Sequence, residues 1–244
     1  MNMPTTRPGL RFRPLVWALL LGCILTYPFS PAVSRPPGDK RDYILVINTY
    51  AESTPWSRGI IADITAHVEQ IENLELYTEH MTLLLVDSPE DIRTFEANLL
   101  REYGKKPPQA LVLIGTPAAL LRNFINSIWQ DIPTIVCAEQ DFIGPDKYYL
   151  KRQPIPASEQ VPLRALADQD NLTLLYSPAY LDQSIDLMKR ILPGMDRLIF
   201  IDDARYVNRQ TEHDLAELLD SKYGGIKYTV YSADEIGIDQ LLDS

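Results

Sequence analysis

The chain has 244 residues, of which 45% are hydrophobic and 23% charged, an ordinary globular composition with room for one large domain or two smaller lobes. Its net charge is −10, and because the first 34 residues hold three arginines and no acid, the remainder carries 20 basic against 33 acidic residues. Such an acidic body argues against sequence-independent binding of nucleic acid, which needs basic surface, and against docking on anionic lipid.

Residues 1–34 have the pattern of a signal peptide or an N-terminal membrane anchor. Basic residues precede an apolar run at 15–25, which is shorter than the roughly 20 residues that a membrane-spanning helix needs. Small residues at 32–34 suit cleavage, whereas the sequence that ends at Cys23 is similar to a bacterial lipobox and makes this cysteine a candidate for lipid attachment. All these alternatives place the rest of the chain in an extracytoplasmic or periplasmic location, and the anchor and the lipid would tether it to the inner membrane.

After a linker at 35–42, strand and helix patterns alternate. Continuous apolar runs such as 43–48 predict strands buried on both faces, and the helical segments carry an apolar stripe of period 3.6. Thr54 is a candidate cap for the first helix, with Pro55 in its first position. The predicted strands lie at 43–48, 74–81, 110–114, 133–137, 172–176, 197–201 and 227–231. The predicted helices lie at 55–71, 89–103, 117–128, 179–192 and 208–222, with a last one beginning near Asp234.

This alternation predicts an α/β protein with parallel sheets that helices cover on both faces. We place a first α/β lobe at 43–147, a crossover or hinge at 148–170 and a partial second α/β lobe at 171–244. The second lobe has three predicted strands against four or more in the first. Because three strands leave an open edge and an uncovered face, we expect the second lobe to be truncated.

The loops that follow the carboxyl ends of parallel strands are where ligands bind in such sheets. The candidate ligand-binding residues there are Tyr50, Ser53, Trp56, Thr116, Glu139, Asp141 and Tyr176, with Asp202 in a corresponding place later in the chain. The Trp56 ring suits stacking, a helix start at Thr116 suits an anion, and the carboxylates at 139 and 141 suit an amine or a sugar hydroxyl. The structural alternatives stay open: core packing for the tryptophan, a plain cap for the threonine and a solvated loop or hinge cap for the carboxylates.

No catalytic motif, cofactor or metal site is predicted. The sequence has no nucleophile elbow, zinc-protease motif, dinucleotide fingerprint or phosphate-binding loop, and its three histidines are not spaced as ligands of one metal. Cys137 lies in an apolar strand and is expected to be a buried structural thiol. We therefore expect a protein that binds a ligand and is not an enzyme.

Two segments resemble a known group of periplasmic-binding-protein-like domains. Residues 48–60, NTYAESTPWSRGI, are similar to the group's first loop and helix, and residues 132–142, IPTIVCAEQDF, to a later strand and loop. The matching residues are Asn48, Tyr50, Trp56, Gly59, Ile60, Pro133, Cys137, Asp141 and Phe142. Ala138 stands where the group usually has glycine, and positions 139 and 140 also differ. The segment 172–202 resembles the entry into the second lobe.

The resemblance implies a class I-like fold of two flavodoxin-like lobes with a small molecule bound between them. It further implies the extracytoplasmic sensor domain of a membrane two-component sensor histidine kinase, often a hybrid one, here as an N-terminal fragment without the kinase core. The alternative within the group is the substrate-binding lipoprotein of an ABC transporter; the weak lipobox and the departures at 138–140 favour the sensor. The implied partners are a small-molecule ligand, the membrane through the N-terminal segment and a second copy in a homodimer.

Overall fold

The structure is a computed structural model, and it describes residues 41–167, 171–203 and 205–232. The predictions for the N-terminal segment, for Cys23, for most of the linker and for a helix beginning near Asp234 lie outside these residues. Within the described ranges, no helix is both long enough and apolar enough to cross a membrane.

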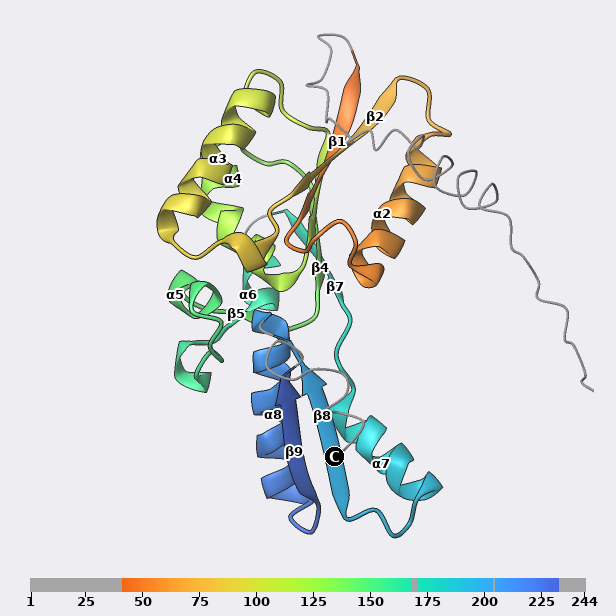
Figure 1. The fold of residues 1–244 in the computed structure, drawn as a ribbon. Helices are drawn as coiled ribbons and strands as arrows, with labels where there is room; N and C mark the ends of the chain where they lie inside the picture. Colours follow the sequence, from red (N-terminus) through yellow and green to blue (C-terminus); the bar gives the residue numbers. More distant parts are fainter. Residues whose placement is uncertain (1–40, 168–170, 204, 233–244) are drawn as a thin grey trace, which may run out of the picture. The chain divides into compact units, whose positions relative to one another are not determined.

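The main sheet has five parallel strands in the order β2-β1-β3-β4-β7 (Figure 1). They are β1 (Asp42–Asn48), β2 (Leu74–His80), β3 (Ala110–Ile114), β4 (Thr134–Ala138) and β7 (Leu172–Tyr176). Because successive side chains of a strand point to opposite faces, Leu45 and Ile47 enter one core cluster and Val46 between them enters another. The predicted α/β class with a parallel central sheet is confirmed.

Helices cover both faces of this sheet (Figure 1). On one face, α2 (Pro55–Val68) packs its apolar stripe against Val46, Val112 and Cys137, and the cysteine is buried as expected. The other face is covered by α3 (Pro89–Tyr103), by the 3-10 helix η2 (Thr116–Leu121) with α4 (Arg122–Ile128) and by α6 (Leu163–Ala167). Because all five strands are parallel, the loops that follow their carboxyl ends lie at the same edge of the sheet.

Local sequence explains where these helices begin. Ser88 caps α3 in a capping box: its Oγ accepts a hydrogen bond from Asp91 N at 3.3 Å, and Asp91 Oδ2 accepts one from Ser88 N at 2.9 Å. Thr54 is the cap residue of α2, as predicted, but its side chain makes no capping hydrogen bond. That helix ends at Val68 instead of Ile71: the amides of Gln70 and Ile71 bond to carbonyls three residues back, and Ile71 is left exposed.

The segment predicted as a crossover at 148–170 is folded onto the main sheet as far as residue 167. The chain from residue 142 to residue 167 forms β5 (Phe142–Ile143), α5 (Asp146–Leu150), the 3-10 helix η3 (Ala157–Glu159), β6 (Val161–Pro162) and α6. Leu163 and Leu166 belong to the core of the main sheet, and Tyr149 and Ile155 form a smaller buried cluster. These elements of two to five residues are too short to show a period, which is why the sequence pattern missed them.

Strand β7 corrects the predicted lobe boundary. Residues 172–176 were assigned to the second lobe, but they pair with β4 and form the edge of the main sheet, with Leu174 beside Val136. The apolar pattern identifies a strand without saying which sheet it joins. The second sheet accordingly has two parallel strands among the described residues, β8 (Arg197–Asp202) and β9 (Lys227–Ser232), with α7 (Leu181–Ile191) and α8 (Tyr206–Lys222) packed on it.

Candidate functional site

The main sheet reverses its direction of growth between β1 and β3, and in such sheets the ligand crevice lies beyond the carboxyl ends of the strands at that point. Thr49 follows β1 there, and Gly115 follows β3. Gly115 has a φ of +95°, and a Cβ on it would clash with the Thr49 hydroxyl and lie 3.0 Å from the Tyr50 ring. A glycine is therefore required for the two loops to come this close.

The side chain of Glu139, which follows β4, reaches both of these loops. Its Oε1 accepts a hydrogen bond from the Tyr50 hydroxyl, and its Oε2 accepts one from Thr116 N at 2.9 Å and one from Thr116 Oγ1 at 3.0 Å. Thr116 Oγ1 in turn accepts a hydrogen bond from Gln140 N at 3.2 Å. The position at Thr116 that suited a ligand anion is thus filled by a carboxylate of the chain itself.

This network keeps its hydroxyl and its neighbouring thiol protonated. Burial raises the pKa of Tyr50 well above its ordinary value, and the charge and hydrogen bond of Glu139 raise it further. Burial also raises the pKa of the Cys137 thiol, with a smaller contribution from Glu139. At neutral pH, Tyr50 is therefore a hydrogen-bond donor and Cys137 is a thiol with little nucleophilic character.

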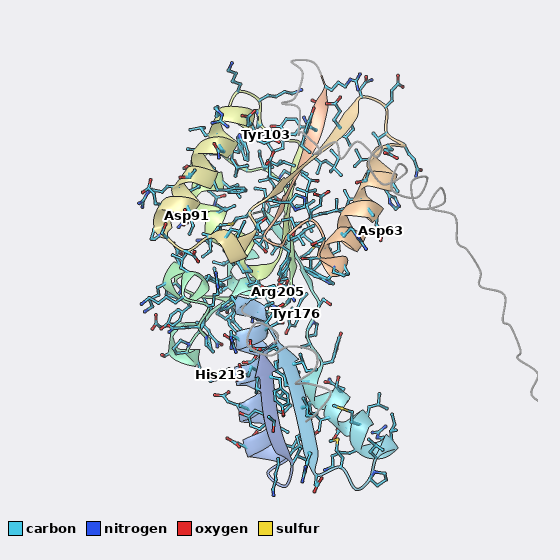
Figure 2. All side chains as sticks on the ribbon, viewed as in Figure 1. Asp63, Asp91, Tyr103, Tyr176, Arg205 and His213 are labelled. Atoms are coloured by element: carbon cyan, nitrogen blue, oxygen red, sulfur yellow. The ribbon has the colours of Figure 1, made fainter. Side chains whose placement is uncertain are left out.

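A small cavity of about 220 Å³ lies beside the network. Tyr50 and Ser53 line it from the loop after β1, Tyr149 from α5, and Arg205 and Tyr206 from the start of α8 (Figure 2 labels Arg205). The Tyr149 and Tyr206 rings have centroids 4.4 Å apart, and burial raises the pKa of both hydroxyls. Tyrosines with neutral hydroxyls therefore form part of the cavity wall, beside the charged side chains of Arg152, Asp203 and Arg205.

The arginines of the small cavity already have acidic partners. Arg205 Nε lies 3.0 and 2.8 Å from the two carboxylate oxygens of Asp203, and Arg152 pairs with Asp87 at 3.1 Å. Because these guanidinium groups are compensated, the small cavity is only weakly suited to an anion. Its modest volume is below the range of roughly 300–1,000 Å³ that is typical of small-molecule sites.

A larger cavity of about 620 Å³ lies beyond the carboxyl ends of β4 and β7. Trp56, Glu139, Asp141 and Tyr176 line it, and all four are residues that the sequence analysis selected. Tyr176, which ends β7 (Figure 2), is 46% exposed. The Trp56 and Tyr50 rings meet edge to face, with centroids 5.9 Å apart. Tyr50 lines the small cavity and Trp56 lines the large one.

The facing wall of the large cavity includes α8, whose polar residues the sequence analysis missed. Gln210 is fully buried: its Oε1 accepts a hydrogen bond from Ile155 N at 2.8 Å, and its Nε2 donates one to Asp214 Oδ1 at 2.8 Å. Burial raises the pKa of Asp214, and the charge of Asp141 adds to the shift. Tyr206, Gln210 and Asp214 are spaced by four, so a polar stripe along one helix face was the available signal.

The structure thus distributes the seven predicted residues over three places. Tyr50 and Ser53 line the small cavity, four others line the large one, and Thr116 is buried against Glu139 in neither. Asp202 also lies outside both cavities, in an ion pair with Arg209 at 2.8 Å. Among residues 41–167, 171–203 and 205–232, no group of three or more acidic, histidine or cysteine side chains is placed to hold a metal ion. The site offers acceptor oxygens and aromatic faces.

No family model and no curated protein matches this sequence. One similar solved structure is a conserved domain protein from Vibrio cholerae O1 biovar eltor, with a TM-score of 0.49 and 17% identity over 80% of this chain and 58% of that chain. Another is the ligand-free, open form of a substrate-binding protein with adhesive properties from Clostridium difficile, with a TM-score of 0.45 and 13% identity over 83% and 60% of the two chains. This chain therefore spans less than two thirds of either neighbour. Scores this low carry no argument about function, which rests on the residues of the chain.

Proposed function

We propose that this chain is an extracytoplasmic domain that binds a small molecule in the large cavity. The observation that carries the proposal is the position of the cavity, which lies beyond the carboxyl ends of the parallel strands β4 and β7, one strand away from the switch point between β1 and β3. Four of the seven residues selected from the sequence line it, and its volume of about 620 Å³ is typical of a small-molecule site. The proposal assigns binding and no catalysis to the chain.

The walls of the cavity come from elements of both sheets. Trp56 and Tyr176 belong to the main sheet and its helices, whereas Asp214 belongs to α8, which packs on the second sheet. A ligand that contacts both walls stabilises the arrangement in which they are close, and so shifts the population toward it. In the finer form of the proposal, a histidine-kinase module attached through the membrane responds to that shift. The resemblance at 48–60 and 132–142 supports this form.

Binding is tested by thermal unfolding of the purified chain with a library of amines, amino acids, carboxylates and sugars. A ligand at one hundred times its Kd is expected to stabilise the chain by roughly 2.7 kcal/mol. Tyr176→Ala should weaken that ligand about tenfold, which corresponds to about 1.4 kcal/mol. Tyr228→Ala is the control, because this tyrosine on β9 is also partly exposed and lines neither cavity. The proposal fails if no compound stabilises the chain, or if both variants bind as the wild type does.

The gene context and the N-terminal modification distinguish the sensor from the transport protein. A reading frame that continues past the codon for Ser244 into a membrane helix and a kinase core would support the sensor. A neighbouring permease gene, together with lipid on Cys23 in the mass spectrum of the membrane-derived chain, would support the substrate-binding lipoprotein of an ABC transporter.

A further inference from the structure

The charge of the large cavity indicates the chemical class of its ligand, and this step rests on the binding function proposed above. Glu139, Asp141, Asp182 and Asp214 all line the cavity, and no lysine, arginine or histidine of the described residues does so. Solvent-exposed acids are common on a protein with a net charge of −10. The question is therefore which of these carboxylates have partners.

Two of the four carboxylates are already compensated. Glu139 accepts the three hydrogen bonds from Tyr50 and Thr116, and Asp182 Oδ1 lies 2.5 Å from the Lys222 ammonium. The other two have no ion-pair partner among the residues that the structure describes, and at most one hydrogen-bond donor each. Asp214 accepts one hydrogen bond, from the neutral amide of Gln210, and the Asp141 carboxylate has no hydrogen-bond or ion-pair partner among the described residues.

The negative charge of Asp141 also acts on Asp214 and on the aromatic wall. The charge of Asp141 contributes to the raised pKa of Asp214, and both contribute, after burial, to the raised pKa of Tyr176. All three side chains line the same cavity, which is the geometric observation behind these contributions. A cation placed among them would relieve the repulsion, whereas an anion would increase it.

The amide of Gln140 is a polar group in the wall of the same cavity that does not contribute to ligand binding. This residue is 7% exposed, and its Oε1 is a buried acceptor without a hydrogen-bond partner among the described residues. Because this oxygen is buried beneath the surface of the cavity and the amide lies close to the Tyr206 hydroxyl, it is not an acceptor for the ligand.

The aromatic side chains provide the remaining contacts. Trp56, Tyr176 and Tyr180 line the cavity, and the last of these is held at a φ of +50°, a left-handed conformation that is rare for a bulky residue. The faces of such rings attract organic cations and cover apolar groups. A bare metal ion would instead need several oxygen ligands at short range, and the described residues hold no such group.

We propose that the ligand of the large cavity is a small organic cation, with an ammonium group held by Asp141 and Asp214 and an apolar or aromatic body against Trp56 and Tyr176. Neutral molecules of the same shape lose the charge interaction, and carboxylates are repelled.

Isothermal titration calorimetry of the purified chain tests the preference for a cation with probes that are similar in shape and differ in charge. The cations are 2-phenylethylamine, tryptamine, putrescine and choline; the neutral and anionic analogues are 2-phenylethanol and 3-phenylpropionate. We expect at least one cation to bind, and its neutral analogue to bind at least tenfold more weakly. Asp141→Asn and Asp214→Asn should each lower the affinity about tenfold or more. Asp220→Asn, an exposed residue of α8 that does not line the cavity, should leave the affinity unchanged.

Asp141 is exposed, so its substitution tests the proposal even if Asp214→Asn unfolds the chain. The cation proposal is overturned if a neutral or anionic compound binds with an affinity that depends on Tyr176 while the amines do not bind. It is also overturned if an amine binds equally well to Asp141→Asn and to the wild type. Either result leaves the small-molecule binding function standing, whereas a failure of every charge class to bind removes both proposals.

Discussion

At the scale of single residues, the carboxylate of Glu139 joins three segments that are distant in sequence. Glu139→Leu keeps most of the side-chain volume but removes both acceptor oxygens, so the donors of Tyr50 and Thr116 lose their partner. Since an unmatched buried polar group costs about 1–3 kcal/mol, we expect a loss of that size in the free energy of unfolding in urea. Tyr50→Phe removes only one of the three hydrogen bonds and should cost less. The opposite order of the two variants would contradict this account of the network.

Gly115 permits the close approach of the loops after β1 and β3, and its replacement should be costly. Gly115→Ala forces a Cβ against Thr49 Oγ1 at a φ of +95°. Backbone strain of this kind is worth about 1–3 kcal/mol, and the steric clash adds to it, so we expect a lower midpoint in thermal unfolding. Gly194→Ala is the matched control, because a Cβ there meets nothing within 4 Å, and its effect should stay within about 0.5 kcal/mol. Equal effects at both glycines would contradict the close approach.

At the scale of elements, the capping of α3 and α2 provides a matched pair of tests. Ser88 caps α3 through its side chain, whereas Thr54 makes no capping hydrogen bond at α2. Ser88→Ala should therefore lower the free energy of unfolding by about 1 kcal/mol, and Thr54→Ala should cost clearly less. A similar loss for both variants would show that the capping box does not contribute to stability.

Ser88→Ala should also change the pKa of Asp91. The hydrogen bond from the Ser88 side chain is the largest cause of the lowered pKa of Asp91. A lowered folded-state pKa stabilises the fold above the unfolded pKa, and the contribution is lost as the pH falls through the folded value. In Ser88→Ala, the Asp91 pKa followed by NMR should rise toward its ordinary value, and the acid-dependent part of the stability should shrink.

The elements that the sequence predicts well are those with local signals. The bounds of α3 agree with the predicted 89–103, because Ser88, Pro89 and Asp91 define its start within four residues. Helix α2 ends at Val68, and the turn that follows at 69–73 contains no glycine or proline that would predict it. The pairing of β7 with β4 depends on contacts between distant segments, as do the short elements between 142 and 167. Pattern reasoning therefore located strands and helices without locating the boundary between the two sheets.

The candidate site follows the same division. Ligand-binding loops follow the carboxyl ends of strands, and the sequence shows where strands end. This rule led to Trp56, Asp141 and Tyr176, which line the large cavity. The bond between Glu139 and Thr116 joins two loops from different strands, so the sequence suggested two separate ligand contacts where the structure has one internal hydrogen-bonded pair. Asp214 was missed for a related reason, since only the packing of α8 brings it to the cavity.

At the scale of the whole molecule, α8 is shared between two cores. Its first turn contributes Tyr206 to the cluster with Tyr149 and Ile155, and its later turns contribute Leu215 and Leu219 to the core of the second sheet. Among the described residues the second sheet has two strands, and Ile199 and Ile201 of β8 are more than half exposed, so its own core is small. The second sheet should therefore depend on the docking of α8 for much of its stability.

Tyr206→Ala tests this dependence. The ring is 3% exposed, and truncating a buried aromatic side chain typically costs about 3–5 kcal/mol. Because Leu215 and Leu219 remain in place, the loss should fall on the docking of the second sheet. Hydrogen exchange measured by mass spectrometry should then accelerate much more in residues 181–232 than in β1, β3 and β4. Tyr228→Ala, on the partly exposed face of β9, should leave the pattern close to that of the wild type. A uniform loss of protection in both sheets on Tyr206→Ala would mean that they unfold as one cooperative unit and that α8 is not the joint between them.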